Sequence, residues 1–105
     1  MVRGDVHAIS LPQKRGRVLH GSRYAVIVQA DDLLALSTVI VCPTSQSAPP
    51  ASFHPEIALG KKVTRVLCEM AGAVDAGRLG DQVGHLGVDE MAAVDDALGM
   101  VLDLY

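Results

Sequence analysis

Short apolar stretches separated by turn-forming residues fill most of this 105-residue chain. The clearest is the β-branched run Val26-Ile27-Val28, which follows the turn-forming pair Gly21-Ser22 and has the length of a buried strand. The same reading predicts strands at Gly4–Leu11, Tyr24–Gln29, Ser37–Cys42, Glu56–Leu59, Lys62–Glu69 (with Ala71–Val74 as its continuation) and Gln82–Leu86.

The segments between these stretches have turn or loop composition. Residues Pro12–Ser22 contain two glycines and three basic residues, which predicts a loop, and Ala30–Leu36 favours a short helical turn. Pro43 is expected to end the third strand, since proline cannot donate to a sheet ladder. The Ser-, Pro- and Ala-rich segment Thr44–Pro55 then predicts a second loop.

The last part of the chain follows a helical period instead. Its apolar residues recur three or four positions apart up to Val101, which Leu102 follows directly, and they define one face, formed by Val88, Met91, Val94, Leu98, Val101 and Leu102. Gly87 is an acceptable N-cap, and the acids Asp89 and Glu90 lie where the helix dipole is positive. The pattern predicts a helix over Val88–Leu102.

Several closely spaced strands followed by one helix predict a mainly β protein, a small antiparallel barrel with a helical lid. The length allows a single domain, residues 1–105. Half of the residues are hydrophobic, although the chain has one Phe, two Tyr and no Trp. This apolar content fits either a second buried face in an oligomer or a well-filled monomer core.

The composition also bears on location and metal binding. No signal peptide or membrane-length apolar run is visible, and Cys42 and Cys68 lie within apolar runs, as expected of reduced core thiols in a cytoplasmic protein. The four histidines and the acids show no metal-ligand spacing, so neither a metal nor another cofactor is expected.

Charge is divided unevenly along the chain. Residues 1–23 carry five basic residues and one acid, whereas residues 79–105 carry six acids and no Lys or Arg. This division fits a protein that meets a polyanion on one side, or two ordinary solvated faces. Arg23 lies where the loop meets the second strand, and there its guanidinium could bind a phosphate with two parallel hydrogen bonds. The alternative is a surface Arg paired with a carboxylate.

These elements carry short motifs in a particular order, and each motif is weak alone. They are Arg3-Gly4-Asp5-Val6, Ser22-Arg23-Tyr24-Ala25-Val26-Ile27-Val28, Thr38-Val39-Ile40-Val41-Cys42-Pro43-Thr44-Ser45, Leu67-Cys68-Glu69, Val74-Asp75 with Arg78-Leu79, and Val83-Gly84-His85-Leu86 followed by the helical pattern. In this order the chain resembles the MazF/PemK/Kid toxins of bacterial type II toxin–antitoxin systems over nearly its whole length.

The resemblance implies a homodimer of SH3-like antiparallel β-barrels, each with a C-terminal α-helix, that cleaves single-stranded RNA without a metal and so inhibits translation and growth. It places the catalytic pair at Arg23 and at Ser45, with Thr44 as the alternative hydroxyl. It further implies substrate contacts from Lys14, Arg15, Arg17, His20 and Gln46. A cognate antitoxin is the expected partner, with an acidic segment that folds onto the basic groove near Arg15, Arg17 and Arg23.

The chemistry accounts for this pair. RNA supplies its own nucleophile, the 2′-hydroxyl, and attack on phosphorus builds negative charge that a bidentate Arg stabilises. A hydroxyl can position the phosphate or the attacking oxygen. His20 is a candidate proton acceptor by its ordinary pKa, or simply an exposed loop histidine.

The chain departs from the family pattern at several positions. His7 replaces an aromatic residue, Tyr24 replaces proline, and Glu69-Met70-Ala71-Gly72 replaces Glu-Gln-Ile-Arg. Two further readings therefore stay open. One is a catalytically weak or silent member that acts by binding an antitoxin or nucleic acid. The other is a gyrase-poison-like binder on the same fold, which would act through a tail containing Trp, a residue that this chain lacks.

Overall fold

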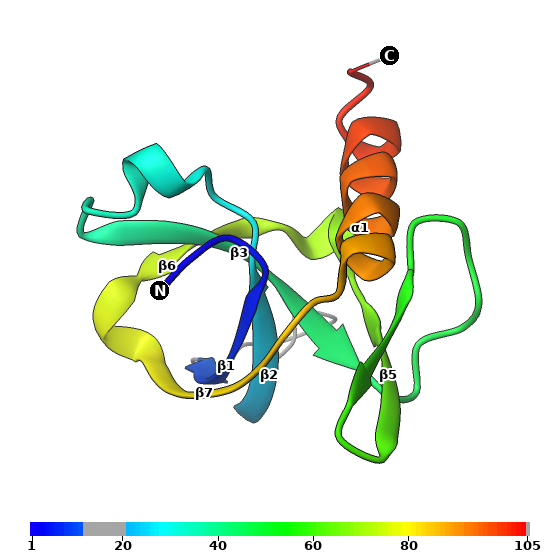
Figure 1. The fold of residues 1–105 in the computed structure, drawn as a ribbon, viewed down its shortest axis with the longest axis horizontal. Coiled ribbons are helices and arrows are strands. Elements are labelled where there is room, and N and C mark those ends of the chain that lie inside the picture. The colour runs from blue at the N-terminus through cyan, green and yellow to red at the C-terminus, as the bar shows by residue number, and fades with distance from the viewer. Residues whose placement is uncertain (12–20, 105) are drawn as a thin grey trace.

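A computed structural model describes residues 1–11 and 21–104. Its seven strands form one curled antiparallel sheet, a half-barrel with a single helix beside it (Figure 1). The strands are β1 (Asp5–Leu11), β2 (Gly21–Ile27), β3 (Thr38–Ser45), β4 (Glu56–Leu59), β5 (Lys62–Val66), β6 (Gly72–Asp75) and β7 (Leu79–His85), and the helix is α1 (Val88–Val101). This architecture confirms the predicted mainly β class with a C-terminal helix.

Strand β3 connects the two parts of the sheet. Its first half pairs with β6 and its middle with β2, whereas Thr44 and Ser45 at its end pair with Val66 and Arg65 of β5. The complete order is β4-β5-β3-β2-β1-β7, with β6 alongside β3. Residues from β2 and β5 can therefore face each other across the end of β3.

The expectation that Pro43 ends the third strand is wrong. Pro43 lies inside β3, opposite Ala25, at the point where the strand changes partner from β2 to β5. Its carbonyl still accepts a hydrogen bond of 2.8 Å from the Leu67 N–H. The strand tolerates the missing N–H at this change of partners, and Thr44 and Ser45 therefore belong to the sheet and not to a loop.

Other boundaries also differ from the prediction. The expected strand Lys62–Glu69 ends at Val66, and Cys68–Met70 forms a 3-10 turn before the separate strand β6. Strand β7 begins earlier than predicted, at Leu79. These differences have one physical cause: period-two patterns do not show where a chain turns from one strand partner to another.

The core has two clusters, one on each face of the sheet. Val26 and Val28 pack in the cluster beneath α1, together with Val94 and Ala97 of the helix, whereas Ala25 and Ile27 pack in the other cluster. Successive side chains of a strand point to opposite faces, so residues 25–28, from the end of β2 to the residue after it, are buried on both sides, as their unbroken apolar run predicts.

The helix begins and ends close to the predicted positions. Gly87 is its N-cap, and the Gly87 N–H donates to Glu90 Oε1 at 2.9 Å. The other oxygen of Glu90 accepts from the Ala58 N–H of β4 at 2.8 Å, which ties the first turn of α1 to the sheet. Val88 and Leu102, predicted on the buried face, are exposed.

Asp5 fastens β1 to β7 from within the protein. This buried carboxylate accepts from the Val2 N–H at 2.8 Å and from Gln82 Nε2 at 3.1 Å, and it lies 2.7 Å from His85 Nδ1. Burial by itself would raise the pKa of Asp5, but the hydrogen bonds from Val2 and His85 hold that pKa below its usual value. The ionised form of Asp5 is therefore favoured in the folded protein.

Candidate functional site

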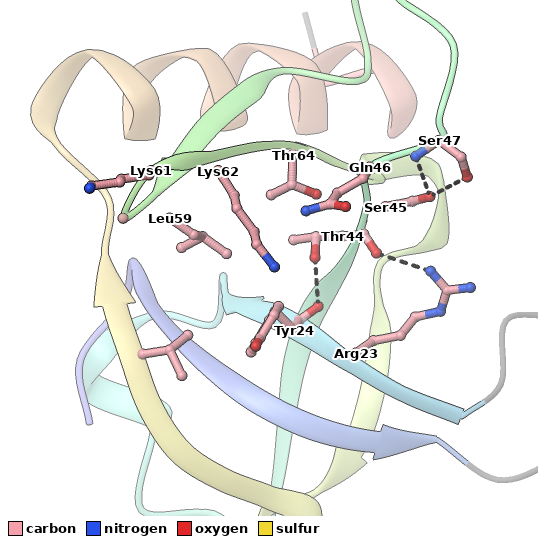
Figure 2. Close-up of a pocket in the computed structure, with 12 residues that line it drawn as sticks. Arg23, Tyr24, Thr44, Ser45, Gln46, Ser47, Leu59, Lys61, Lys62 and Thr64 are labelled. Atoms are coloured by element: carbon pink, nitrogen blue, oxygen red, sulfur yellow. Dashed lines mark hydrogen bonds between the residues drawn. The ribbon is translucent and has the colours of Figure 1, made fainter.

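A cavity of about 820 Å³ opens where the end of β3 lies between β2 and the β4–β5 hairpin (Figure 2). One wall comes from β2, a second from the end of β3 and the residues after it, and a third from the hairpin. The lining residues are Arg23, Tyr24, Thr44, Ser45, Gln46, Ser47, Leu59, Gly60, Lys61, Lys62, Thr64 and Val83. The cavity therefore brings together four of the site residues predicted from the sequence, namely Arg23, Thr44, Ser45 and Gln46.

Arg23 lies on β2 opposite Ile9 and is half-buried. Its Nη1 donates to the Thr44 carbonyl at 3.3 Å, and its Nε is buried without a hydrogen-bond partner. None of the described carboxylates forms an ion pair with Arg23. Within residues 1–11 and 21–104, the guanidinium thus has no carboxylate partner, and its remaining Nη donors are available to an anion in the cavity.

The two candidate hydroxyls differ in what they contact. Thr44 is 4% exposed and its Oγ1 donates to the Tyr24 carbonyl at 3.1 Å, so this hydroxyl links β3 to β2. Ser45 is half-buried, and its Oγ lies 3.1 Å from Ser47 Oγ and accepts from the Ser47 N–H at 3.3 Å. The Thr44 hydroxyl is bonded to the backbone of β2, whereas the Ser45 hydroxyl contacts, within the described part of the chain, only the side chain and amide of Ser47.

The hairpin supplies two lysines that the sequence analysis did not include among the site residues. Gly60, at a φ of +63°, makes the turn before Lys61 and Lys62. In Figure 2 the Lys62 side chain points into the cavity toward Tyr24, and Lys61 points away from it. Neither forms an ion pair with any described residue. The sequence shows this turn as Gly-Lys-Lys between two short strands, but not that the turn lies beside the end of β3.

Arg23 and Tyr24 also border a second cavity of about 360 Å³, on the side toward β1. Its other lining residues are Ala8, Ile9, Ser10, Arg78 and Gly80. Arg23 is thus shared by two adjoining hollows, and Arg78 brings a further cation to the second.

Four predicted substrate-binding residues, Lys14, Arg15, Arg17 and His20, lie outside the described residues. Gln46 lies in the wall of the larger cavity, directly after Ser45 (Figure 2). Across residues 1–11 and 21–104, no group of three or more His, Cys, Asp or Glu side chains is placed to hold a metal ion. No helix in these same residues has the length and apolar character to cross a membrane.

The sequence of this chain matches a known protein family over nearly its whole length. Residues 2–102 match the sequence profile of the PemK-like, MazF-like toxins of type II toxin–antitoxin systems. The chain is 36% identical over 106 residues to the candidate toxin Rv3098A of Mycobacterium tuberculosis, covering 99% of both proteins.

Two solved structures with similar folds are named as a MazF protein and as an endoribonuclease. MazF from Deinococcus radiodurans superposes with a TM-score of 0.85 at 20% identity, over 98% of this chain and 96% of that one. A mycobacterial endoribonuclease in complex with its cognate antitoxin gives 0.83 at 18% identity, over 100% and 97%. These likenesses show the fold, and the profile match together with the 36% identical relative shows the family. The chain belongs to the PemK-like, MazF-like toxins of type II toxin–antitoxin systems.

Proposed function

We propose that this protein is an endoribonuclease toxin that cleaves single-stranded RNA in the cytoplasm, with Arg23 and the Ser45 hydroxyl at the reacting phosphate. The observation that carries the proposal is the guanidinium of Arg23, which borders the cavity with no carboxylate paired to it among the described residues. Structural relatives named as endoribonucleases support it.

In the proposed reaction the RNA 2′-oxygen attacks the adjacent phosphorus while the bond from phosphorus to the 5′-oxygen breaks. The 2′-hydroxyl loses its proton to a base, and the leaving 5′-oxygen gains one. Charge accumulates on the non-bridging oxygens, where the Arg23 guanidinium stabilises it. Because the substrate provides the nucleophile, the chain's own residues need only bind and orient the RNA and neutralise the charge that develops on the phosphate oxygens.

Ser45 is the better candidate for the hydroxyl that contacts RNA. Among residues 1–11 and 21–104 its Oγ contacts only Ser47, whereas the Thr44 hydroxyl is buried and donates to the Tyr24 carbonyl. Lys62, on the opposite wall, is suited to contact a neighbouring phosphate without taking part in bond breaking. Gln46 would contact the same strand, and Lys14, Arg15, Arg17 and His20 remain proposed substrate contacts.

The proposal includes two protein partners. A second copy of the chain would cover part of the exposed apolar surface, which includes Ile40, Met100 and Leu102. An antitoxin would compete with RNA for the cationic cavity; a structural relative is named as an endoribonuclease bound to its cognate antitoxin, and another as MazE–MazF.

The test is single-turnover cleavage of a defined single-stranded RNA, with and without a chelator. We expect Arg23→Ala to slow cleavage roughly 100-fold, the usual effect of losing one preorganised donor, and Arg23→Lys to rescue little of it. Arg3→Ala is the matched control, since Arg3 pairs with Asp95 and lies outside the cavity. If Arg23→Ala melts normally and cleaves at the wild-type rate, the assignment of Arg23 is wrong. If the wild-type protein cleaves no RNA, the proposed activity itself fails.

A further inference from the structure

A buried histidine connects the segment after Ser45 to the body of the protein. His54 is 5% exposed and lies in the segment 46–55 between β3 and β4, which loops out beside the hairpin and α1 (Figure 1). Its Nδ1 lies 2.8 Å from the Pro49 carbonyl, and its Nε2 lies 2.7 Å from Glu69 Oε2. Both ring nitrogens therefore have partners, one within the segment and one on the 3-10 turn Cys68–Met70.

The nature of these partners determines the protonation of the ring. A backbone carbonyl can only accept a hydrogen bond, and so can an ionised carboxylate. Both His54 nitrogens must then carry hydrogen, which makes the ring a positively charged imidazolium. Burial by itself would lower the pKa of His54, but the hydrogen bonds to Glu69 and Pro49 raise it above the usual value.

Among the described residues, the other charged groups near the ring belong to β4 and β5. Arg65 Nη1 donates to the His54 carbonyl at 3.0 Å, and its charge opposes protonation of the ring. Arg65 is itself neutralised by Glu56, at 2.7 Å. Glu69 thus remains the anion that directly balances the buried imidazolium.

The contact with Pro49 matters because little else fixes this part of the segment. The later residues are held by backbone hydrogen bonds, from His54 N–H to Ala51 at 3.0 Å and from Cys68 N–H to Phe53 at 3.4 Å. Among the described residues, the Pro49–His54 contact is the one hydrogen bond that holds residues 48–50. Pro49 follows Ser45 by four positions, and Gln46 and Ser47 in between form cavity wall.

We propose that His54, protonated on both nitrogens and anchored by Glu69, is a positioning residue that fixes the segment after Ser45 and so sets the cavity wall formed by Gln46 and Ser47. The link to catalysis rests on the proposed function. The clamp itself, defined as Pro49, His54 and Glu69, does not, since it can be observed in the protein without RNA.

The proposal gives a definite pH dependence. A folded-state pKa above the unfolded value of about 6.5 means that the clamp's stabilising contribution is complete below that value. It is lost as the pH rises through the folded-state pKa. The segment should therefore loosen with increasing pH, and RNA binding should weaken with it.

The variant Glu69→Gln separates the charge from the contacts. The amide that it introduces can donate to a neutral His54 Nε2, which leaves Nδ1–H to donate to Pro49, so the clamp persists without a titrating imidazolium. His54→Gln removes the ring and its second donor. His85→Gln is the matched control: it breaks a histidine–carboxylate pair of the same 2.7 Å length, on β7, where Gln82 still donates to Asp5.

The experiment combines ring-nitrogen NMR of His54, amide hydrogen exchange of residues 46–48 at several pH values, and KM and kcat for RNA cleavage. We expect a doubly protonated ring near pH 6 in the wild type, with exchange protection that falls at alkaline pH. His54→Gln should lose that protection at every pH and raise KM roughly five- to tenfold at nearly constant kcat, the effect of about one hydrogen bond on substrate positioning. Glu69→Gln should keep the protection and lose its pH dependence, and His85→Gln should match the wild type.

A neutral His54 ring near pH 6 would overturn the proposal, and so would unchanged protection and KM in His54→Gln. The same holds if Glu69→Gln retained the wild-type pH dependence, a result that stays decisive even if His54→Gln does not fold. Should the wild type cleave no RNA, the proposed function fails, while the NMR and exchange measurements still decide whether the clamp exists.

Discussion

The neighbouring hydroxyls of Thr44 and Ser45 on β3 make different contacts. Both residues line the cavity, but the Thr44 hydroxyl donates to the Tyr24 carbonyl, whereas Ser45 Oγ contacts Ser47 alone among the described residues. Adjacent residues on a strand face opposite sides of the sheet, so a single step along the chain separates a structural hydroxyl from an available one.

Ser45→Ala should slow single-turnover RNA cleavage roughly tenfold, the effect of losing one neutral hydrogen bond, without lowering the melting temperature. Thr44→Val, which keeps the shape, should cleave near the wild-type rate but lose about 1 kcal/mol of stability, since the Tyr24 carbonyl then lacks its donor. The reverse result, with Thr44→Val as the slower enzyme and melting unchanged, would move the assignment to Thr44.

Lys62 and Lys61 make a matched pair on one hairpin turn, of which only Lys62 points into the cavity (Figure 2). Lys62→Ala should weaken RNA binding roughly fivefold at unchanged kcat, as expected for one exposed charge contact. The slope of log affinity against log salt concentration should become shallower by about 0.7, the value for one phosphate contact on a single strand. Equal effects from Lys61→Ala would show that the hairpin contributes only general positive charge.

Arg23 could be found from sequence because a strand pattern and a family resemblance both lead to it. Lys62 could not be placed by the same means. Its position depends on β5 pairing with the end of β3, and a prediction that ends β3 at Cys42 gives the hairpin no reason to face β2. The His54–Glu69 contact was missed for a related reason, since it joins residues 15 positions apart across a turn with no periodic signal.

At the scale of elements, the sequence patterns identified the strands and the helix but not their partners. The 3.6-residue period and Gly87 located α1 closely because both are local signals. The end of β3, the early start of β7 and the separation of β6 from β5 depend on pairing between distant segments, which a local pattern does not contain.

Glu90 is the residue through which α1 is fastened to β4. Both of its oxygens accept backbone hydrogen bonds, from Gly87 and from Ala58. Glu90→Ala should lower the free energy of unfolding by about 1 kcal/mol, the usual value of a helix cap, as measured by urea denaturation. Asp89→Ala is the control, since no hydrogen bond from Asp89 to another element is present among the described residues. Comparable losses in the two variants would mean that the charge near the helix N-terminus, and not the link to β4, accounts for the stabilisation.

At the scale of the whole molecule, large apolar side chains of several elements lie on the surface. Twelve large hydrophobic residues among those described are exposed, including Tyr24, Val63 and Leu104. Where such side chains form a contiguous patch, the patch is typical of a surface that associates with another protein. It is consistent with the dimer that we propose, although composition alone left a well-filled monomer core equally open.

Sedimentation at micromolar concentration should therefore give a species of twice the 11.0 kDa chain mass. Its mass should change little with salt, because burial of apolar area and not ion pairing would hold the copies together. A single 11.0 kDa species over the whole concentration range would contradict the proposed dimer.

The pairing of β1 with β7 has a consequence for the order in which a ribosome makes this protein. Asp5 emerges early, but its partner His85 is 80 residues further along the chain. Until β7 has been synthesised, β1 has one open edge and Asp5 lacks the Gln82 and His85 side chains that contact it. The helix that covers one face of the core is made later still. Arg23 and Ser45 are translated well before that point, yet the scaffold that holds them is completed only near the end of synthesis, so a nascent chain carries the site residues long before it carries a finished site.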